Sequence, residues 1–275
     1  MSPCSIVAML AGSETARCIM HGCAAELAIG RAGCKAWGRG RPRPPTFLYR
    51  DASLVVVDKP AGLLCHRTEL APDRDVVMMR VRDAVGAHVY PVHRLDRGTS
   101  GALLFALSSE VAAVLRVAFD EGRIVKTYLA MARGHTPEHV IVDYPIPKAE
   151  GTKERVAAVT ELRRLGAGDH ASLVECHPRT GRYHQIRRHL AHLRHPIAVD
   201  SNYGTGWFNR DVRARTGLAR LALHASVLSF VHPVTLVPVQ ARAPVPQDLR
   251  RAIDVLGLGE ALRAYEVPLS VRLDR

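Results

Sequence analysis

Short apolar runs alternate with segments whose apolar residues recur at helical spacing. Residues 54–57 (LVVV) and 102–107 (ALLFAL) are continuous apolar runs of strand length, bounded by polar and glycine-containing segments. We therefore expect buried strands there. Between them, residues 77–86 carry three valines four residues apart and end in glycine. This spacing predicts a helix with a glycine stop.

A second helix is predicted between Ser108 or Ser109, either of which can accept an N-cap hydrogen bond, and Gly122. Its apolar stripe is expected to bury Val111, Val114, Leu115 and Ala118. Residues 127–132 follow as a strand on which alternate residues, Tyr128 among them, share one face.

The second half of the chain contains further strand-like segments. Residues 156–162 and 172–176 flank a glycine-rich turn at 166–169 and predict a hairpin. Residues 221–231 are a long strand candidate, and a leucine and isoleucine stripe in residues 249–256 predicts a C-terminal helix. Because strands outnumber helices and hairpins recur, we expect an α+β fold with a mixed, largely antiparallel central β-sheet and flanking helices.

The first 46 residues differ from the rest of the chain. They hold four of the six cysteines, lack a sustained apolar period and end in the glycine- and proline-rich segment 38–45 (GRGRPRPP). Such a segment disfavours helix and central strand. We predict a basic, disordered extension over residues 1–46 and one folded domain over residues 47–275. The alternative for the extension is a basic arm that contacts RNA phosphates.

Charge and cysteine usage narrow the choice of partner. Lysine and arginine total 38 against 26 aspartate and glutamate, a formal net charge of +12, which favours a polyanionic partner. We expect nucleic acid rather than a membrane, because no apolar run reaches transmembrane length. The cysteines form no C-x-x-C pair and no signal peptide is recognisable, so reduced thiols in the cytoplasm are expected.

A single acidic residue stands out in residues 93–101 (HRLDRGTSG). Asp96 lies between Arg94 and Arg97, directly before the apolar run 102–107. A carboxylate kept ionised at this place can act as a nucleophile or as a base. The alternative is an aspartate that only caps the turn which follows it.

A basic segment, residues 180–196, carries an apolar stripe of Tyr183, Ile186, Leu190 and Leu193. Arg187 borders this stripe and needs a carboxylate partner if it is partly buried. An arginine beside Asp96 would in turn stabilise the ionised carboxylate. The alternative is an amphipathic helix with a solvated basic face. The segment is rich in histidine but offers no recognised ligand set, so no metal is expected; the histidines are interpreted as polar or RNA-facing.

Several motifs, taken together and in order, resemble the RluA family of pseudouridine synthases. They are residues 54–62 (LVVVDKPAG), 93–101, 126–130 (KTYLA), 180–189 (TGRYHQIRRH) and 223–225 (LHA). The resemblance covers about residues 47–245 and is greatest to the TruC-type branch, which acts on tRNA.

The resemblance implies that residues 47–275 are a catalytic domain with a catalytic cleft, in which one uridine in RNA is isomerised to pseudouridine without a cofactor. It implies that Asp96 is the catalytic carboxylate, that Arg187 pairs with it and that Tyr128 stacks on the base. Leu223 would pack on the other side of the base, and Arg94 would replace the flipped uridine in the stack. Further RNA contacts are implied for Arg97, Arg182, His184 and Arg188.

The expected substrate is a tRNA uridine near the junction of the acceptor and T stems, acted on by a cytoplasmic monomer. Three alternatives stay open at this point. They are a synthase acting on large-subunit ribosomal RNA, a catalytically silent RNA-binding protein, and a hydrolase that would need a second carboxylate near the bond.

Overall fold

The computed structural model describes residues 43–66, 75–204 and 206–267. Most of the predicted N-terminal extension lies outside these residues, and its last residue begins the first strand. No helix in the described part of the chain has the length and apolar character needed to cross a bilayer.

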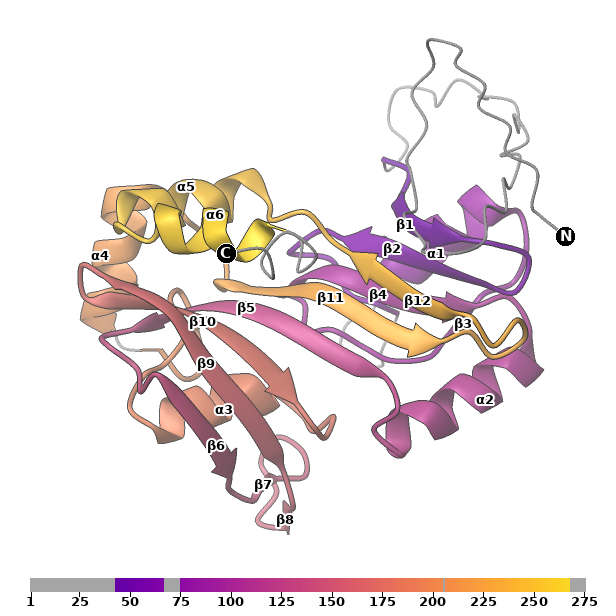
Figure 1. The fold of residues 1–275 in the computed structure, drawn as a ribbon, viewed down its shortest axis with the longest axis horizontal. Helices are drawn as coiled ribbons and strands as arrows, with labels where there is room; N and C mark the ends of the chain where they lie inside the picture. The colour runs from indigo at the N-terminus through magenta and orange to yellow at the C-terminus, as the bar shows by residue number, and fades with distance from the viewer. Residues whose placement is uncertain (1–42, 67–74, 205, 268–275) are drawn as a thin grey trace, which may run out of the picture. The chain divides into compact units, whose positions relative to one another are not determined.

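A ten-stranded sheet forms the centre of the fold, and two short strands pair separately (Figure 1). The strands are β1 (Thr46–Arg50), β2 (Leu54–Lys59), β3 (Tyr90–Pro91), β4 (Ser100–Ala106), β5 (Val125–Arg133), β6 (His139–Asp143), β7 (Ile146–Pro147), β8 (Arg155–Val156), β9 (Val159–Gly168), β10 (Ala171–Pro178), β11 (Leu223–Val231) and β12 (Pro238–Arg242). The helices are α1 (Val77–Val85), α2 (Ser109–Asp120), α3 (Gln185–His192), α4 (Gly206–Thr216), α5 (Gln247–Val255) and α6 (Gly259–Glu266).

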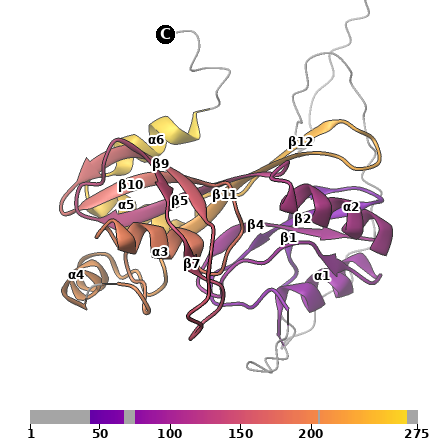
Figure 2. The same ribbon diagram turned by 90° about the horizontal axis from the view of Figure 1, so that it is seen from below.

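The strand order is β1-β2-β4-β11-β5-β10-β9-β6, with β12 beside β11 and β3 beside β4. Among the described strands only the β4–β11 pair is parallel. The predicted α+β class with a mixed, largely antiparallel sheet is therefore confirmed. Figures 1 and 2 show α1 and α2 beside the β2–β4 half of the sheet and α3 to α6 beside the β5–β10–β9 half.

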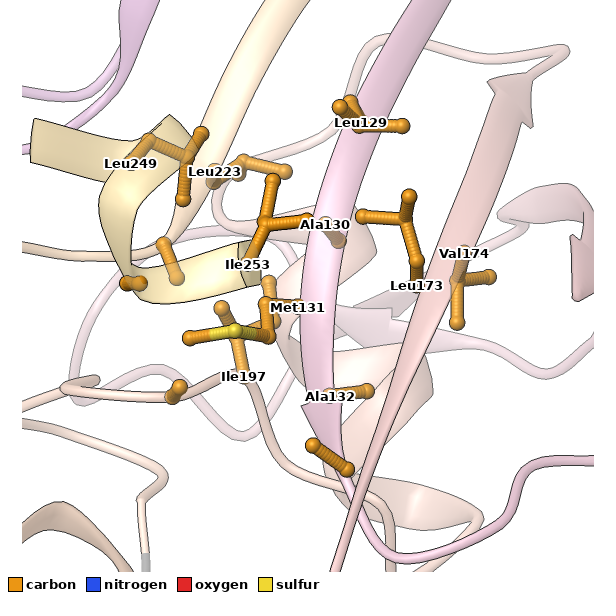
Figure 3. Close-up of a cluster of buried hydrophobic side chains, with 14 of the residues drawn as sticks. Leu129, Ala130, Met131, Ala132, Leu173, Val174, Ile197, Leu223, Leu249 and Ile253 are labelled. Atoms are coloured by element: carbon orange, nitrogen blue, oxygen red, sulfur yellow. The ribbon is translucent and has the colours of Figure 1, made fainter. Parts of the chain in front are cut away.

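Apolar side chains pack on both halves of this sheet. The largest cluster joins β5, β10 and the start of β11 to α5 and to the segment around Ile197 (Figure 3). A second cluster packs α2 against β2, β4, β11 and β12, and a third places α1 on the opposite face of β2 and β4. Because β4 is buried along its whole length, its start is a rigid support for the residues that precede it.

Two local predictions hold at helix ends. Gly86 ends α1 in the left-handed conformation with φ 77°, as the glycine stop predicts. Ser108 caps α2 and accepts a hydrogen bond from the Val111 amide at 3.3 Å. The expected burial of Val114 is wrong: it is 49% exposed. Helix α2 turns Ala112 toward the sheet in its place, together with the predicted Leu115 and Ala118.

The predicted β9–β10 hairpin forms, but its turn lies later than expected. Strand β9 continues to Gly168, and the turn is made by Asp169 and His170. Both glycines that suggested a turn lie inside the strand. A Cβ on Gly168 would lie 2.0 Å from the carbonyl oxygen of Leu256, and one on Gly166 would lie 2.6 Å from the Cβ of Ala261. The glycines allow α5 and α6 to approach the strand.

Candidate active site

Asp96 lies in the segment that joins β3 to β4, and four hydrogen bonds to the backbone hold this segment. The Gly62 amide donates to the Arg97 carbonyl at 2.7 Å, and the Thr99 amide donates to the Asp96 carbonyl at 3.0 Å. The thiol of Cys65 bonds both the amide and the carbonyl of Leu95, at 3.1 and 3.2 Å. The Asp96 backbone thus closes the turn, and the carboxylate contacts Arg187 and His184 among the described residues.

Lys59 supports the same segment from inside the protein. Its side chain is fully buried, and its ammonium donates to the carbonyls of Pro60, Arg97 and Thr99 at 3.0, 3.2 and 2.7 Å. Burial lowers the pKa of Lys59 to about 8, although the nearby Asp96 favours its charged form. The chain that follows Asp96 is therefore anchored to one cation.

Gly101 explains how this segment reaches β11. It adopts φ 112°, and a Cβ there would lie 2.1 Å from the carbonyl oxygen of Ala225. Only glycine permits this approach of β4 to β11. The parallel pairing places Ala225 opposite Gly101, two residues after Leu223.

Helix α3 brings Arg187 to Asp96, and its guanidinium contacts four acceptors. Nη1 donates to Oδ2 of Asp96 at 3.2 Å, Nε and Nη2 donate to the two carboxylate oxygens of Asp200 at 2.8 Å each, and Nη2 also reaches Oδ1 of Asn202 at 3.0 Å. The Arg187 side chain is only 7% exposed. The two residues that the sequence analysis pairs, Asp96 and Arg187, therefore do meet.

Asp200 is the main partner of Arg187, and the sequence analysis did not assign it a role. Its side chain is fully buried. Burial by itself would raise the pKa of Asp200, but the hydrogen bonds and charge of Arg187 lower it below its usual value. Both members of the pair stay charged. The sequence did contain a signal for this partner. Arg187 needs a buried carboxylate, and Asp200 is the first acidic residue after Glu175.

Tyr128 on β5 and Leu223 at the start of β11 come from neighbouring strands, where Ala225 pairs with Tyr128. Leu223 is buried and Tyr128 half-buried. Together with Asp96 they line a cavity of about 680 Å³. Burial, and next the charge of Asp96, raise the pKa of Tyr128, so this phenol keeps its proton.

A second cavity, of about 540 Å³, also borders Asp96. Its lining includes Arg94, Arg97 and Arg213, all exposed, so it is cationic. Asp96 and Arg187 line both cavities. The carboxylate therefore lies in the middle of a cleft large enough for a nucleotide and its flanking phosphate.

The remaining predicted RNA contacts differ in availability. Arg94 is exposed at the cleft, and Arg97 and Arg182 are exposed but donate to the carbonyls of Gly62 and Ala157. Arg188, also predicted to contact RNA, is half-buried and donates to the Tyr203 hydroxyl and the Pro147 carbonyl, at 2.8 Å each.

The basic helix begins later than predicted. Tyr183 lies before α3 rather than on its apolar stripe, stacks on His184 and donates to Glu150 at 3.0 Å. No group of three or more histidine, cysteine, aspartate or glutamate residues that could hold a metal ion occurs in the described ranges.

Comparisons with known proteins show which family this chain resembles. Residues 53–192 match the family described as RNA pseudouridylate synthase. The chain is 42% identical over 237 residues to tRNA pseudouridine synthase C of Vibrio cholerae, covering 78% of this chain and 97% of that protein. It is also 42% identical over 252 residues to tRNA pseudouridine synthase C of Yersinia pestis, covering 83% of this chain and 98% of that protein.

Solved structures resemble this fold as well. Human RNA Pseudouridylate Synthase Domain Containing 4 superposes with a TM-score of 0.65 at 26% identity, over 77% of this chain and 93% of that one. Human RNA Pseudouridylate Synthase Domain Containing 1 superposes with a TM-score of 0.61 at 28% identity, over 74% of this chain and 84% of that one.

Proposed function

This chain belongs to the RNA pseudouridylate synthase family, and we propose that it converts one specific uridine of tRNA to pseudouridine with Asp96 as the catalytic carboxylate. The observation that carries the proposal is the ion pair between Asp96 and the buried Arg187 in the middle of a cleft. The tRNA substrate is supported by relatives about 40% identical over most of their length, all named tRNA pseudouridine synthase C.

The reaction is an isomerisation, so its atoms balance within the nucleotide. The bond between N1 of uracil and C1′ of the ribose breaks, the base turns, and C5 bonds to C1′. C5 loses a proton and N1 gains one. Asp96 acts on the ribose as nucleophile or base, and Arg187 and Asp200 hold its carboxylate in place.

Tyr128 and Leu223 line the cavity beside Asp96 and are suited to hold the flipped uracil between a ring and an apolar side chain. Because Tyr128 keeps its proton, its hydroxyl is a hydrogen-bond donor before the reaction rather than a base. Arg94, exposed at the mouth of both cavities, would enter the RNA stack in place of the flipped uridine, and Arg97 and Arg182 would contact phosphates.

The hydrolase alternative requires a second available carboxylate near Asp96. Asp200 shares Arg187 with Asp96 and is one candidate. Both of its oxygens are held by Arg187 and its side chain has no exposed surface, so it cannot activate a water. Asp120 is exposed, lines the same cavity as Asp96 and is a second candidate; release of free uracil would reveal hydrolysis.

We place the target uridine near the junction of the acceptor and T stems and the enzyme in the cytoplasm, as a monomer. Pseudouridine maps of total RNA from strains with and without this gene test the assignment. One tRNA position should lose its signal in the deletion strain and regain it with the wild type and with the exposed control Asp83→Asn, but not with Asp96→Asn. Loss confined to ribosomal RNA would refute the tRNA assignment. Unchanged maps would favour a silent RNA-binding protein.

A further inference from the structure

His184 is held in an unusual position beside the candidate catalytic carboxylate. It is the N-cap residue of α3 and adopts φ 54° and ψ 28°, in the left-handed region that few non-glycine residues adopt, asparagine, aspartate and histidine most often. Its side chain makes no capping hydrogen bond. A histidine kept at such a place without a capping role points to a requirement for its ring.

The ring of His184 is fixed by its neighbours. Tyr183 stacks on it with centroids 3.8 Å apart and an interplanar angle of 21°, and Tyr203 meets it edge-on at 5.7 Å. The side chain is 10% exposed, and its Nε2 lies 3.7 Å from Oδ2 of Asp96. Rotation of the ring away from Asp96 would break both aromatic contacts.

Hydrogen bonds from Arg188 determine which ring nitrogen carries the proton. Nε of Arg188 donates to the Tyr203 hydroxyl at 2.8 Å, and a guanidinium can only donate. The hydroxyl lies 3.2 Å from Nδ1 of His184 and has no other acceptor within hydrogen-bonding distance in the described part of the chain. Its single proton therefore goes to Nδ1, and the proton of the neutral ring lies on Nε2.

The charge environment keeps the ring neutral. Burial lowers the pKa of His184, and Arg187 and Arg188 lower it further, against the opposing effects of Asp96 and Asp200. A neutral ring with its proton on Nε2 presents one N–H group toward Asp96.

We propose that His184 is a positioning residue that directs its Nε2–H at Oδ2 of Asp96. Arg187 donates to this same oxygen, and in the described structure no donor lies within hydrogen-bonding distance of Oδ1. The two donors together reserve Oδ1 for the ribose. The 3.7 Å separation shortens to a hydrogen bond when substrate fills the cleft, as catalytic contacts commonly do.

This inference rests on the proposed function and changes the RNA-contact role expected for His184. A residue that only bound RNA would alter KM, whereas one that orients Asp96 alters kcat. The conservative variant His184→Gln keeps an N–H donor and an acceptor for Tyr203, while His184→Leu has neither. His170, which also has a left-handed backbone (φ 52°) but lies in the exposed β9–β10 turn, provides the matched control His170→Leu.

The experiment measures tritium release from tRNA labelled at C5 of uridine, together with thermal denaturation of each variant. His184→Leu should lower kcat by about tenfold to a hundredfold, the range expected for a lost hydrogen bond to a charged group, with KM changed less than about threefold. His184→Gln should stay within about threefold of the wild type, and His170→Leu should match the wild type. A rise in KM alone for His184→Leu, or no change in kcat, would overturn the proposal.

Nitrogen-15 spectra of histidine-labelled protein test the tautomer without any substrate. The signal pair that disappears in His184→Gln should have a protonated Nε2 and an unprotonated Nδ1 in the wild type, and Tyr203→Phe should introduce the other tautomer. A proton on Nδ1 in the wild type would refute the inference. Absence of tritium release by the wild type would instead refute the proposed function, and the spectra would still decide the tautomer.

Discussion

Replacing Asp200 by asparagine separates the positioning of Arg187 from the chemistry of Asp96. Asparagine keeps the size of the side chain and the oxygen that accepts from the amides of Asn202 and Tyr203, at 2.9 and 3.1 Å. It removes the negative charge and one of the two hydrogen bonds that Arg187 makes at 2.8 Å. The guanidinium is then left with Asp96 as its only charged partner among the described residues.

The expected cost follows from burial. The side chains of Arg187 and Asp200 are 7% and 0% exposed, and removing one partner of such a pair costs about 3–5 kcal/mol. We take the lower value, about 3 kcal/mol, because the amide still accepts one hydrogen bond, and for a domain of this size it lowers Tm by roughly 6–12 °C. Arg187 should also turn toward Asp96, and a misplaced group of this kind lowers kcat by about a hundredfold.

Calorimetry and tritium release at a temperature where the variant stays folded measure both effects. Glu266→Gln is the control, because it breaks an ion pair with Arg250 whose side chains are 32% and 38% exposed, and should cost less than about 1 kcal/mol. If Asp200→Asn lowers Tm but leaves kcat within about threefold of the wild type, Asp200 only stabilises the fold. If neither quantity changes, the assignment of Arg187 and Asp200 as a buried pair is wrong.

Three further predictions concern residues that surround Asp96 or support its segment. Gly101→Ala should lose more than about 3 kcal/mol of unfolding free energy or fail to fold, since its Cβ would lie 2.1 Å from the Ala225 carbonyl oxygen; chemical denaturation measures this, and a loss below 1 kcal/mol would contradict it. Tyr128 should not ionise below about pH 10, because burial and Asp96 raise its pKa, so an ultraviolet difference titration of wild type against Tyr128→Phe should show no phenolate there. The pKa of Lys59 falls from about 10.4 in the unfolded chain to about 8 in the folded protein, so the unfolded chain binds more protons between these pH values. The unfolding free energy of the wild type relative to Lys59→Met should therefore rise from pH 8 to pH 10, and a fall would contradict the assignment.

The sequence predicted those parts of the fold that depend on local chemistry. The valine spacing and Gly86 predicted α1, and Ser108 predicted the start of α2, because capping involves only neighbouring residues. Gly168 led to a wrong position for the β9–β10 turn. Glycine is needed there because the backbone of Leu256, far along the chain, lies too close for a side chain. A glycine required by a distant backbone looks the same in the sequence as a glycine required by a turn.

The candidate site was predictable in part for the same reason. Asp96 and Arg187 lie in segments whose residue types call for a partner of opposite charge. The roles of Lys59 and Cys65 depend on hydrogen bonds to backbone carbonyls and amides, which leave no signature in residue type. The burial of Arg188 against Tyr203 arises only when the segment after α3 folds back on the helix.

Single-turnover tritium release from C5-labelled tRNA, comparing the wild type with Asp96→Asn at equal tRNA binding, tests the central claim most directly. The account predicts that the wild type releases tritium and that Asp96→Asn binds the same tRNA with similar affinity but releases none above background. Release by Asp96→Asn at a rate within about tenfold of the wild type would contradict the claim that this carboxylate performs the reaction.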